Sequence, residues 1–158
     1  MDWNPSGSDN IFDELRVAAR VNEEEFEDAI ATSDWIKMIT SNPARILALD
    51  GQVGRLAQGL KADITVLASK NSDPHESLLN NHLQDVQMVW VGGALLYGNN
   101  AILQKVRAGE CEELIVKGSK KRICVRNTKE NVTKSGQTLG DIQNILQTNY
   151  SGLAPLTP

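Results

Sequence analysis

The spacing of apolar residues changes near residue 51 and again near residue 138, and this change limits the fold more than any other feature. Over the first fifty residues apolar side chains recur with a helical period of 3.6. Residues 62–68, 85–99 and 112–126 instead carry runs of β-favouring residues. The order of helices, strands and one helix differs from regular βαβ alternation, so the sequence predicts an α+β fold.

Three helices are predicted in the first fifty residues. The first carries the apolar face of Phe12 and Leu15, and the third contains Pro43 at its first position and ends at Gly51. Each follows a side chain that can accept hydrogen bonds from free helix N–H groups. The candidate caps are Ser8 or Asp9, Thr32 or Ser33, and Asn42.

The strand-rich part predicts two hairpins. The first turns at Gly92–Gly93 and the second at Gly118–Ser119, because glycine favours such turns. The stretch "NAILQKVRAGE" between them is compatible with a short helix or a loop. Thr138 predicts the start of a last helix, and the prolines of "SGLAPLTP" predict an extended end.

The overall charge and hydropathy exclude two classes of partner. The net charge of -4 argues against a protein that neutralises nucleic-acid phosphates. The sequence contains no stretch of 18 apolar residues, so we expect no membrane span, and the first thirty residues lack the pattern of a secretory signal. We therefore expect a cytoplasmic protein without nucleic-acid or membrane partners.

Cysteine and histidine supply few candidates for a site. Cys111 and Cys124 could face each other across a hairpin, but in a cytosolic protein we expect them to be reduced. His75 and His82 are two helical turns apart, too far to bind one zinc ion together, and we expect both in a surface loop. The motifs G-x-S-x-G, H-E-x-x-H, G-x-G-x-x-G and the P-loop are absent.

The opening "MDWNPSGSDN" is the remaining candidate. It places Asp2 and Asp9 near Ser6 and Ser8 in a turn-forming segment. A carboxylate in such a segment can bind a metal or transfer a proton, but the residues alone define no self-sufficient active site.

Three segments in the same order resemble the metal-dependent amidohydrolase superfamily. The stretch "SNPARILALDGQVGRLAQGLKADITVL" (41–67) resembles its helix–turn–strand signature, and "DVQMVWVGGALLYG" (85–98) resembles the strand pair that follows. "DWNPSGSDNIFDELRVA" (2–18) resembles the segment after barrel strand eight in the branch of cytosine deaminase, imidazolonepropionase and chlorohydrolases. The signature residues are Asn42, Pro43, Ala44, Leu47, Leu49, Gly54, Leu56, Gly59, Ala62, Asp63, Val66 and Leu67.

This resemblance implies a position within a larger architecture. Residues 1–50 would be helices from the end of a (β/α)8 barrel, and residues 51–127 the C-terminal strands of a small antiparallel β-sandwich. Residues 128–158 would form a terminal helix and an extended tail. Because the barrel would cover the apolar faces of the first helices, we expect the chain alone to self-associate.

The resemblance also assigns one site residue. Asp2 matches the strand-eight aspartate that contacts a divalent metal, zinc or iron, and transfers a proton during hydrolysis of non-peptide C–N bonds or deamination. A catalytic metal usually needs three protein ligands and a water molecule, and the family's histidine ligands are missing here. We therefore expect this chain alone to bind no metal and to be inactive on the enzyme's small-molecule substrate.

Three interpretations remain open at this point. The chain could be a truncated enzyme, or half of a split enzyme completed by a separate barrel chain. Alternatively, it could be a non-enzymatic β-rich interaction module that binds a partner.

Overall fold

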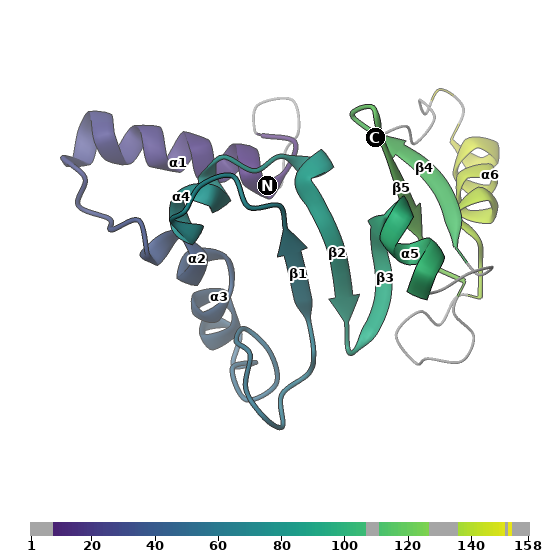
Figure 1. Ribbon diagram of the computed structural model, residues 1–158, viewed down its shortest axis with the longest axis horizontal. Helices are drawn as coiled ribbons and strands as arrows, with labels where there is room; N and C mark the ends of the chain where they lie inside the picture. Colours follow the sequence, from purple (N-terminus) through teal and green to yellow (C-terminus); the bar gives the residue numbers. More distant parts are fainter. Residues whose placement is uncertain (1–7, 107–110, 127–135, 151, 153–158) are drawn as a thin grey trace. The chain divides into compact units, whose positions relative to one another are not determined.

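A computed structural model describes most of the chain. It combines helices with a sheet of antiparallel hairpins, and so confirms the predicted α+β class (Figure 1). The described residues are 8–106, 111–126, 136–150 and 152.

The chain divides into two compact units, each formed by two segments. The first unit comprises Met1–Lys61 and Leu67–Asp85, and its described elements are mainly helices. The second comprises Ala62–Val66 and Val86–Pro158 and contains most of the sheet.

Helix α1 spans Ile11–Phe26 in the first unit. Its N-cap is Asn10 and not Ser8 or Asp9 as predicted, because the Asn10 side chain accepts the N–H groups of Phe12 and Asp13. The helix ends at a left-handed residue, Glu27, with φ 49°.

Two short helices follow, α2 (Asp34–Ile39) and α3 (Ser41–Ile46). The start of α2, predicted at Thr32 or Ser33, lies at Ser33, although the Ser33 side chain makes no capping hydrogen bond. The bounds predicted for α3 are wrong, since Pro43 is its third residue and the helix ends five residues before Gly51. Ala48 is left-handed with φ 56°, and Leu49 N–H bonds back to the Ala44 carbonyl at 2.7 Å, which closes the helix early.

Helix α4 (Pro74–Leu79) forms in the polar segment that we predicted to be a loop. The Asp73 carboxylate caps it by accepting the N–H groups of His75 and Glu76. This helix packs against α1 and α2. The buried apolar residues of the first unit are Phe12, Leu15, Trp35, Ala44 and Leu78.

The sheet has five strands in the order β1-β2-β3-β5-β4. Both predicted hairpins are present, with β2 antiparallel to β3 and β4 antiparallel to β5. The first turns at Gly92–Gly93 as predicted. The second turns one residue earlier than predicted, because Lys117 and Gly118 take the two positive φ angles, 46° and 80°. The strand bounds are β1 Ile64–Leu67, β2 Val86–Val91, β3 Ala94–Asn99, β4 Glu112–Val116 and β5 Ser119–Ile123.

A 3-10 turn, η1 (Leu83–Asp85), precedes β2. Among the described residues of the second unit, two helices accompany the sheet. Helix α5 (Asn100–Val106) occupies the stretch left open as helix or loop, and it packs against β3 and β5. Helix α6 (Leu139–Asn149) starts at Thr138, as predicted, with a complete capping box to Asp141. Figure 1 shows α6 beside β4.

The two cysteines form a disulfide, so the expected reduced pair is wrong. Glu112 pairs with Ile123 in the β4–β5 ladder, which places Cys111 opposite Cys124 with 4.2 Å between their Cα atoms. Cys124 also belongs to the buried cluster of Leu95 and Leu103. The pairing follows from the register of the hairpin, whereas our expectation came only from the cellular compartment.

Large apolar side chains remain exposed on the helices and loops of the first unit. Ile46 is 81% exposed and Leu56 is 74% exposed, although both lie in the signature segment. Within the described ranges, no helix is long and apolar enough to cross a membrane.

Candidate functional site

The predicted site residue Asp2 lies outside the described residues, as does Ser6. The described chain begins at Ser8, whose N–H lies 3.4 Å from the Glu14 carboxylate. Helix α1 follows shortly after this point in the chain.

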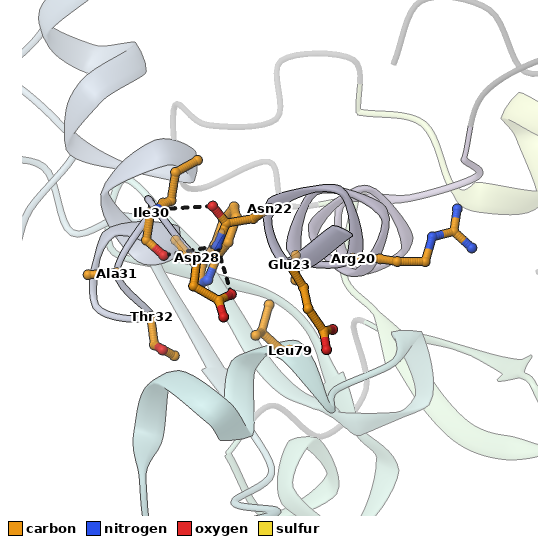
Figure 2. A pocket seen from close by; sticks show the side chains of 10 residues that line it. Arg20, Asn22, Glu23, Asp28, Ile30, Ala31, Thr32 and Leu79 are labelled. Atoms are coloured by element: carbon orange, nitrogen blue, oxygen red, sulfur yellow. Dashed lines mark hydrogen bonds between the residues drawn. The ribbon is translucent and has the colours of Figure 1, made fainter. Parts of the chain in front are cut away.

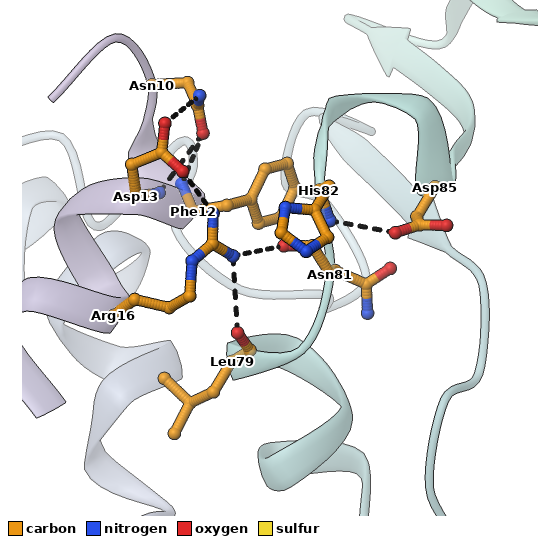
Figure 3. Close-up of polar contacts among 8 residues, drawn as sticks. All are labelled: Asn10, Phe12, Asp13, Arg16, Leu79, Asn81, His82 and Asp85. Carbon is orange, nitrogen blue, oxygen red and sulfur yellow. Dashed lines mark hydrogen bonds and ion pairs between the residues drawn. The ribbon is translucent and has the colours of Figure 1, made fainter. Parts of the chain in front are cut away.

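The first turn of α1 is held by a set of side-chain hydrogen bonds. Asn10 accepts two helix N–H groups and also donates its amide to Asp13 at 2.7 Å. Asp13 in turn forms an ion pair with Arg16 (Figure 3). Asp13 and Glu14 place negative charge at the helix N-terminus, where the helix dipole stabilises it.

Arg16 connects α1 to the segment after α4. Its guanidinium donates to the Asn81 carbonyl at 2.7 Å and to the Leu79 carbonyl at 3.5 Å. Figure 3 shows Arg16 between Asp13 on its own helix and these two carbonyls. This link was not predicted, because its only signal in the sequence is an Asp–Arg pair three residues apart.

Asp85 is a buried carboxylate with two described donors. The Lys70 ammonium lies 2.6 Å from one oxygen. The His82 N–H donates to the other oxygen at 2.9 Å (Figure 3). Burial acts to raise the pKa of Asp85. The hydrogen bonds from Lys70 and His82, together with their positive charges, outweigh this effect and hold the pKa below its ordinary value.

The buried side chain of Asn81 forms hydrogen bonds in the same region. It is 1% exposed, and its amide donates to the carbonyls of Ala68 at 3.2 Å and Ser77 at 2.5 Å. The Ser77 hydroxyl accepts the Lys70 N–H at 2.8 Å. These bonds tie α4 to the chain on both sides of it, and their geometry indicates a structural role.

A hollow of about 500 Å³ lies at the C-terminal end of α1. The buried side chain of Asn22 forms part of its wall, accepting the Ile30 N–H at 2.9 Å and donating to the Ile30 carbonyl at 3.2 Å (Figure 2). Trp35 and Leu79 supply apolar surface, whereas the exposed Arg20 and Glu23 supply opposite charges. The lining also contains the Thr32 hydroxyl and the Asp28 carboxylate. Thr32 forms no hydrogen bond with a carboxylate of this lining in the part of the chain that the structure describes, so the hollow has no activated nucleophile there.

The histidines are not part of a metal centre in the described structure. The backbone N–H of His75 is used in the cap of α4, and His82 is exposed after the same helix. Among the residues that the structure describes, no group of three or more His, Cys, Asp or Glu side chains could hold a metal ion.

The signature residues act in packing and turn formation. Gly54 has φ +95°, and a Cβ atom there would lie 2.5 Å from the Ala44 Cβ, so glycine is required at this contact. The Asp63 carboxylate accepts the Gly92 N–H at 2.6 Å and thereby caps the β2–β3 turn. The signature thus maintains the fold at two points.

The amidohydrolase family pattern matches residues 4–118, which is more than half of the chain. The chain belongs to the amidohydrolase family. The family match agrees with the signature segment and with the α+β arrangement of the chain.

Two similar relatives carry the same name. The 5-methylthioadenosine/S-adenosylhomocysteine deaminase of Thermoanaerobacter pseudethanolicus is 30% identical over 102 residues. The protein of that name from Acetivibrio thermocellus is 28% identical over 102 residues. Each alignment covers 59% of this chain and 24% of the relative, so this amidohydrolase chain matches about a quarter of their length.

Proposed function

We propose that this chain is the C-terminal segment of a metal-dependent hydrolase that acts on non-peptide C–N bonds, with a deaminase of the cytosine deaminase-like branch as the best candidate. The family match over residues 4–118 carries this proposal. The deaminase names of the two relatives support the reaction class and a small-molecule substrate.

The proposed arrangement of the complete enzyme follows the resemblance. Residues 1–50 belong to the end of a (β/α)8 barrel, residues 51–127 to a composite β-sandwich, and residues 128–158 to a terminal extension. The apolar side chains exposed on the first unit, among them Ile46 and Leu47, support a covering barrel portion. Without that portion, we expect the chain to self-associate.

Asp2 is the residue of this chain that we assign to catalysis and metal contact. In the complete enzyme its carboxylate accepts a proton and returns it to the leaving nitrogen. A divalent ion, zinc or iron, would be held there in part by Asp2 and would make a coordinated water more acidic, for zinc with a pKa of about 7 instead of 15.7. The part of the chain that the structure describes contains no three-ligand set. We infer from the resemblance that the other ligands belong to the barrel portion of the complete enzyme, which we place in the cytoplasm, and we expect the chain alone to be inactive.

A chimeric enzyme tests the assignment of Asp2. The C-terminal portion of the Thermoanaerobacter relative is replaced by this chain, and ammonia release from 5-methylthioadenosine is measured. We expect a chimera with measurable activity that the Asp2→Asn substitution lowers by about a hundredfold or more. Asp9→Asn is the matched control and should change the rate by less than about twofold.

Two results would contradict the proposal. An active chimera that retains its rate with Asp2→Asn would remove the assignment of Asp2. Ammonia release by the 158-residue chain alone, with zinc or iron added, would contradict its expected inactivity. This second assay does not depend on whether the chimera folds.

Gene context separates the three organisational alternatives. In-frame H-x-H and histidine-bearing strand motifs directly upstream would support a continuous enzyme. The same motifs in a neighbouring separate reading frame would support a split enzyme. A gene context with neither would favour the interaction module.

A further inference from the structure

Strand β4 lies at one end of the five-stranded sheet, so one of its sides has no neighbouring strand among the described residues. Val116 and Ser119 pair on either side of the Lys117–Gly118 turn, and hydrogen-bonded pairs alternate with open pairs along an antiparallel ladder. Counted from this turn, Ile115 and Glu113 direct their backbone N–H and C=O groups away from β5. The outer side of β4 therefore presents backbone groups to which a further strand can bind.

The side chains of Glu113 and Ile115 lie on an exposed face of β4. The Glu113 side chain is 44% exposed, and its carboxylate lies 3.8 Å from the Lys120 ammonium on β5. Ile115 is 47% exposed, although it is a large apolar residue in a strand. Lys117 continues the same alternation into the turn and is also exposed. This face thus carries an acid, an apolar residue and a base at every second position.

Helix α6 is attached to the opposite face of β4. Neighbouring residues of a strand point to opposite faces, so Glu112 points away from the face that carries Glu113. The Glu112 carboxylate accepts the Leu139 N–H at 2.5 Å and the Gly140 N–H at 3.1 Å, and both donors belong to the first turn of α6. The exposure of Glu113 and Ile115 agrees with this placement, because α6 leaves both side chains uncovered.

Residues 113–117, with the sequence ELIVK, are complementary to a second copy of themselves. When two copies run antiparallel about a two-fold axis at Ile115, Glu113 of each copy lies opposite Lys117 of the other, and Ile115 lies opposite Ile115. The two apolar residues between them face each other in the same way on the other face. Opposite charges and apolar side chains directly across two strands stabilise their pairing. Every residue of the segment therefore meets a suitable partner in this one register.

Other registers leave the two charges of this segment unmatched. A parallel arrangement in register places Glu113 opposite Glu113 and Lys117 opposite Lys117, and like charges directly opposite each other destabilise a strand pair. A shift of the two-fold axis to Leu114 places Glu113 opposite Ile115 and leaves Lys117 without an acid. Edge strands usually carry charges that prevent pairing. Here the charges disfavour the parallel and shifted registers and favour the register centred on Ile115.

We propose that the outer edge of β4 is a homodimer interface, at which two copies of the chain pair antiparallel about Ile115. The two Ile115 residues exchange backbone hydrogen bonds, and the two Glu113–Lys117 pairs fix the register. The sheets of the two copies then form one continuous sheet across the two-fold axis. The interface uses neither Asp2 nor the apolar side chains exposed on the first unit, so it is independent of the proposed function.

Amide exchange followed by NMR tests the interface in the purified 158-residue chain. The Ile115 N–H should exchange about tenfold or more slowly in a concentrated sample than in a dilute one, because it gains a partner only in the dimer. The Leu114 N–H faces β5 in both states, so it is the internal reference and should depend much less on concentration. Sedimentation velocity at the same concentrations measures the fraction of dimer.

Charge reversal separates this interface from association through the first unit. Glu113→Lys and Lys117→Glu each create two like-charge contacts, and each should raise the dimer dissociation constant by about tenfold. The double variant restores both contacts with reversed polarity and should recover the dimer. An equimolar mixture of the two single variants should also dimerise, since every contact then joins opposite charges. Lys105→Glu on α5 makes the same charge change at another exposed residue and should leave the dissociation constant unchanged.

Three results would overturn the proposed interface. The first is a chain that sediments as a monomer at every concentration, which would leave the β4 edge to a strand of a different protein. The second is a chain that dimerises while Ile115 exchange stays constant, which would place the contact elsewhere, for example on the first unit. The third is a mixture of the two single variants that associates no more strongly than either variant alone.

Discussion

The Lys70 ammonium lies 2.6 Å from the Asp85 carboxylate, whose side chain is only 12% exposed. The backbone N–H of His82 donates to the second carboxylate oxygen. A buried carboxylate with two such donors is stabilised in its charged form. The segment after β1 therefore depends on the ionisation of one side chain.

We predict that Asp85 makes the first unit sensitive to acid. Its folded pKa lies below the unfolded value, so its contribution is fully present above the unfolded pKa of about 3.9 and is lost as pH falls through the folded pKa. Asp85→Asn should lower the free energy of unfolding at pH 7 by roughly 1–2 kcal/mol. The difference from the parent protein should shrink below about pH 4.

Hydrogen exchange of the α1 and α4 amides at pH 7 and near pH 3 measures this dependence. The exposed residue Asp50 provides the control, because Asp50→Asn should behave like the parent at both pH values. An Asp85→Asn effect of equal size at both pH values would contradict the role of ionisation.

Loss of Arg16 should loosen the attachment of α1 to the chain after α4. Arg16→Ala removes donors to the Leu79 and Asn81 carbonyls, and we expect a loss of roughly 1–3 kcal/mol in urea unfolding. Arg16→Lys should recover part of this, since an ammonium can reach a carbonyl without reproducing the planar fork. Arg20→Ala, one turn later and exposed, should have little effect.

Asn22 should be required for the turn between α1 and α2. Asn22→Ala leaves the N–H and carbonyl of Ile30 without their side-chain partner, which should cost roughly 1–3 kcal/mol. Asn22→Asp retains an acceptor for the Ile30 N–H and should be intermediate. Trp35 lies in the same wall, so tryptophan fluorescence during urea unfolding reports the change, with the exposed Glu23→Gln as control.

Two glycines of the second unit should respond oppositely to alanine. A Cβ at Gly98 would lie 2.5 Å from the Gln87 carbonyl oxygen and 2.7 Å from Leu103, so Gly98→Ala should destabilise the sheet by roughly 1–3 kcal/mol. A Cβ at Gly140 meets only ordinary contacts of 3.6 Å and more. Gly140→Ala should therefore leave stability unchanged or raise it by up to about 1 kcal/mol. Thermal unfolding of the two variants compares the signs, and equal losses would contradict this account.

Local sequence signals predicted which helices and strands form better than they predicted where each one begins and ends. The start of α6 at Thr138 is confirmed, because its capping box joins residues within one turn of each other. The start of α2 is confirmed at Ser33, although the Ser33 side chain makes no capping hydrogen bond. Asn10 was missed since Ser8, Asp9 and Asn10 are all good caps, and only the backbone path decides among them. Pro43 was likewise assigned to the wrong turn of its helix.

The sequence by itself determined the α+β class, the two hairpins and the family, because periodicity and a signature segment are local patterns. Only the tertiary structure decided that Cys111 meets Cys124, that Arg16 meets Asn81, and that Glu112 anchors Leu139. Each of these contacts joins residues 13 or more positions apart. Such contacts depend on strand register and helix packing, which follow from the burial of many side chains together. No single residue in the sequence therefore indicates them.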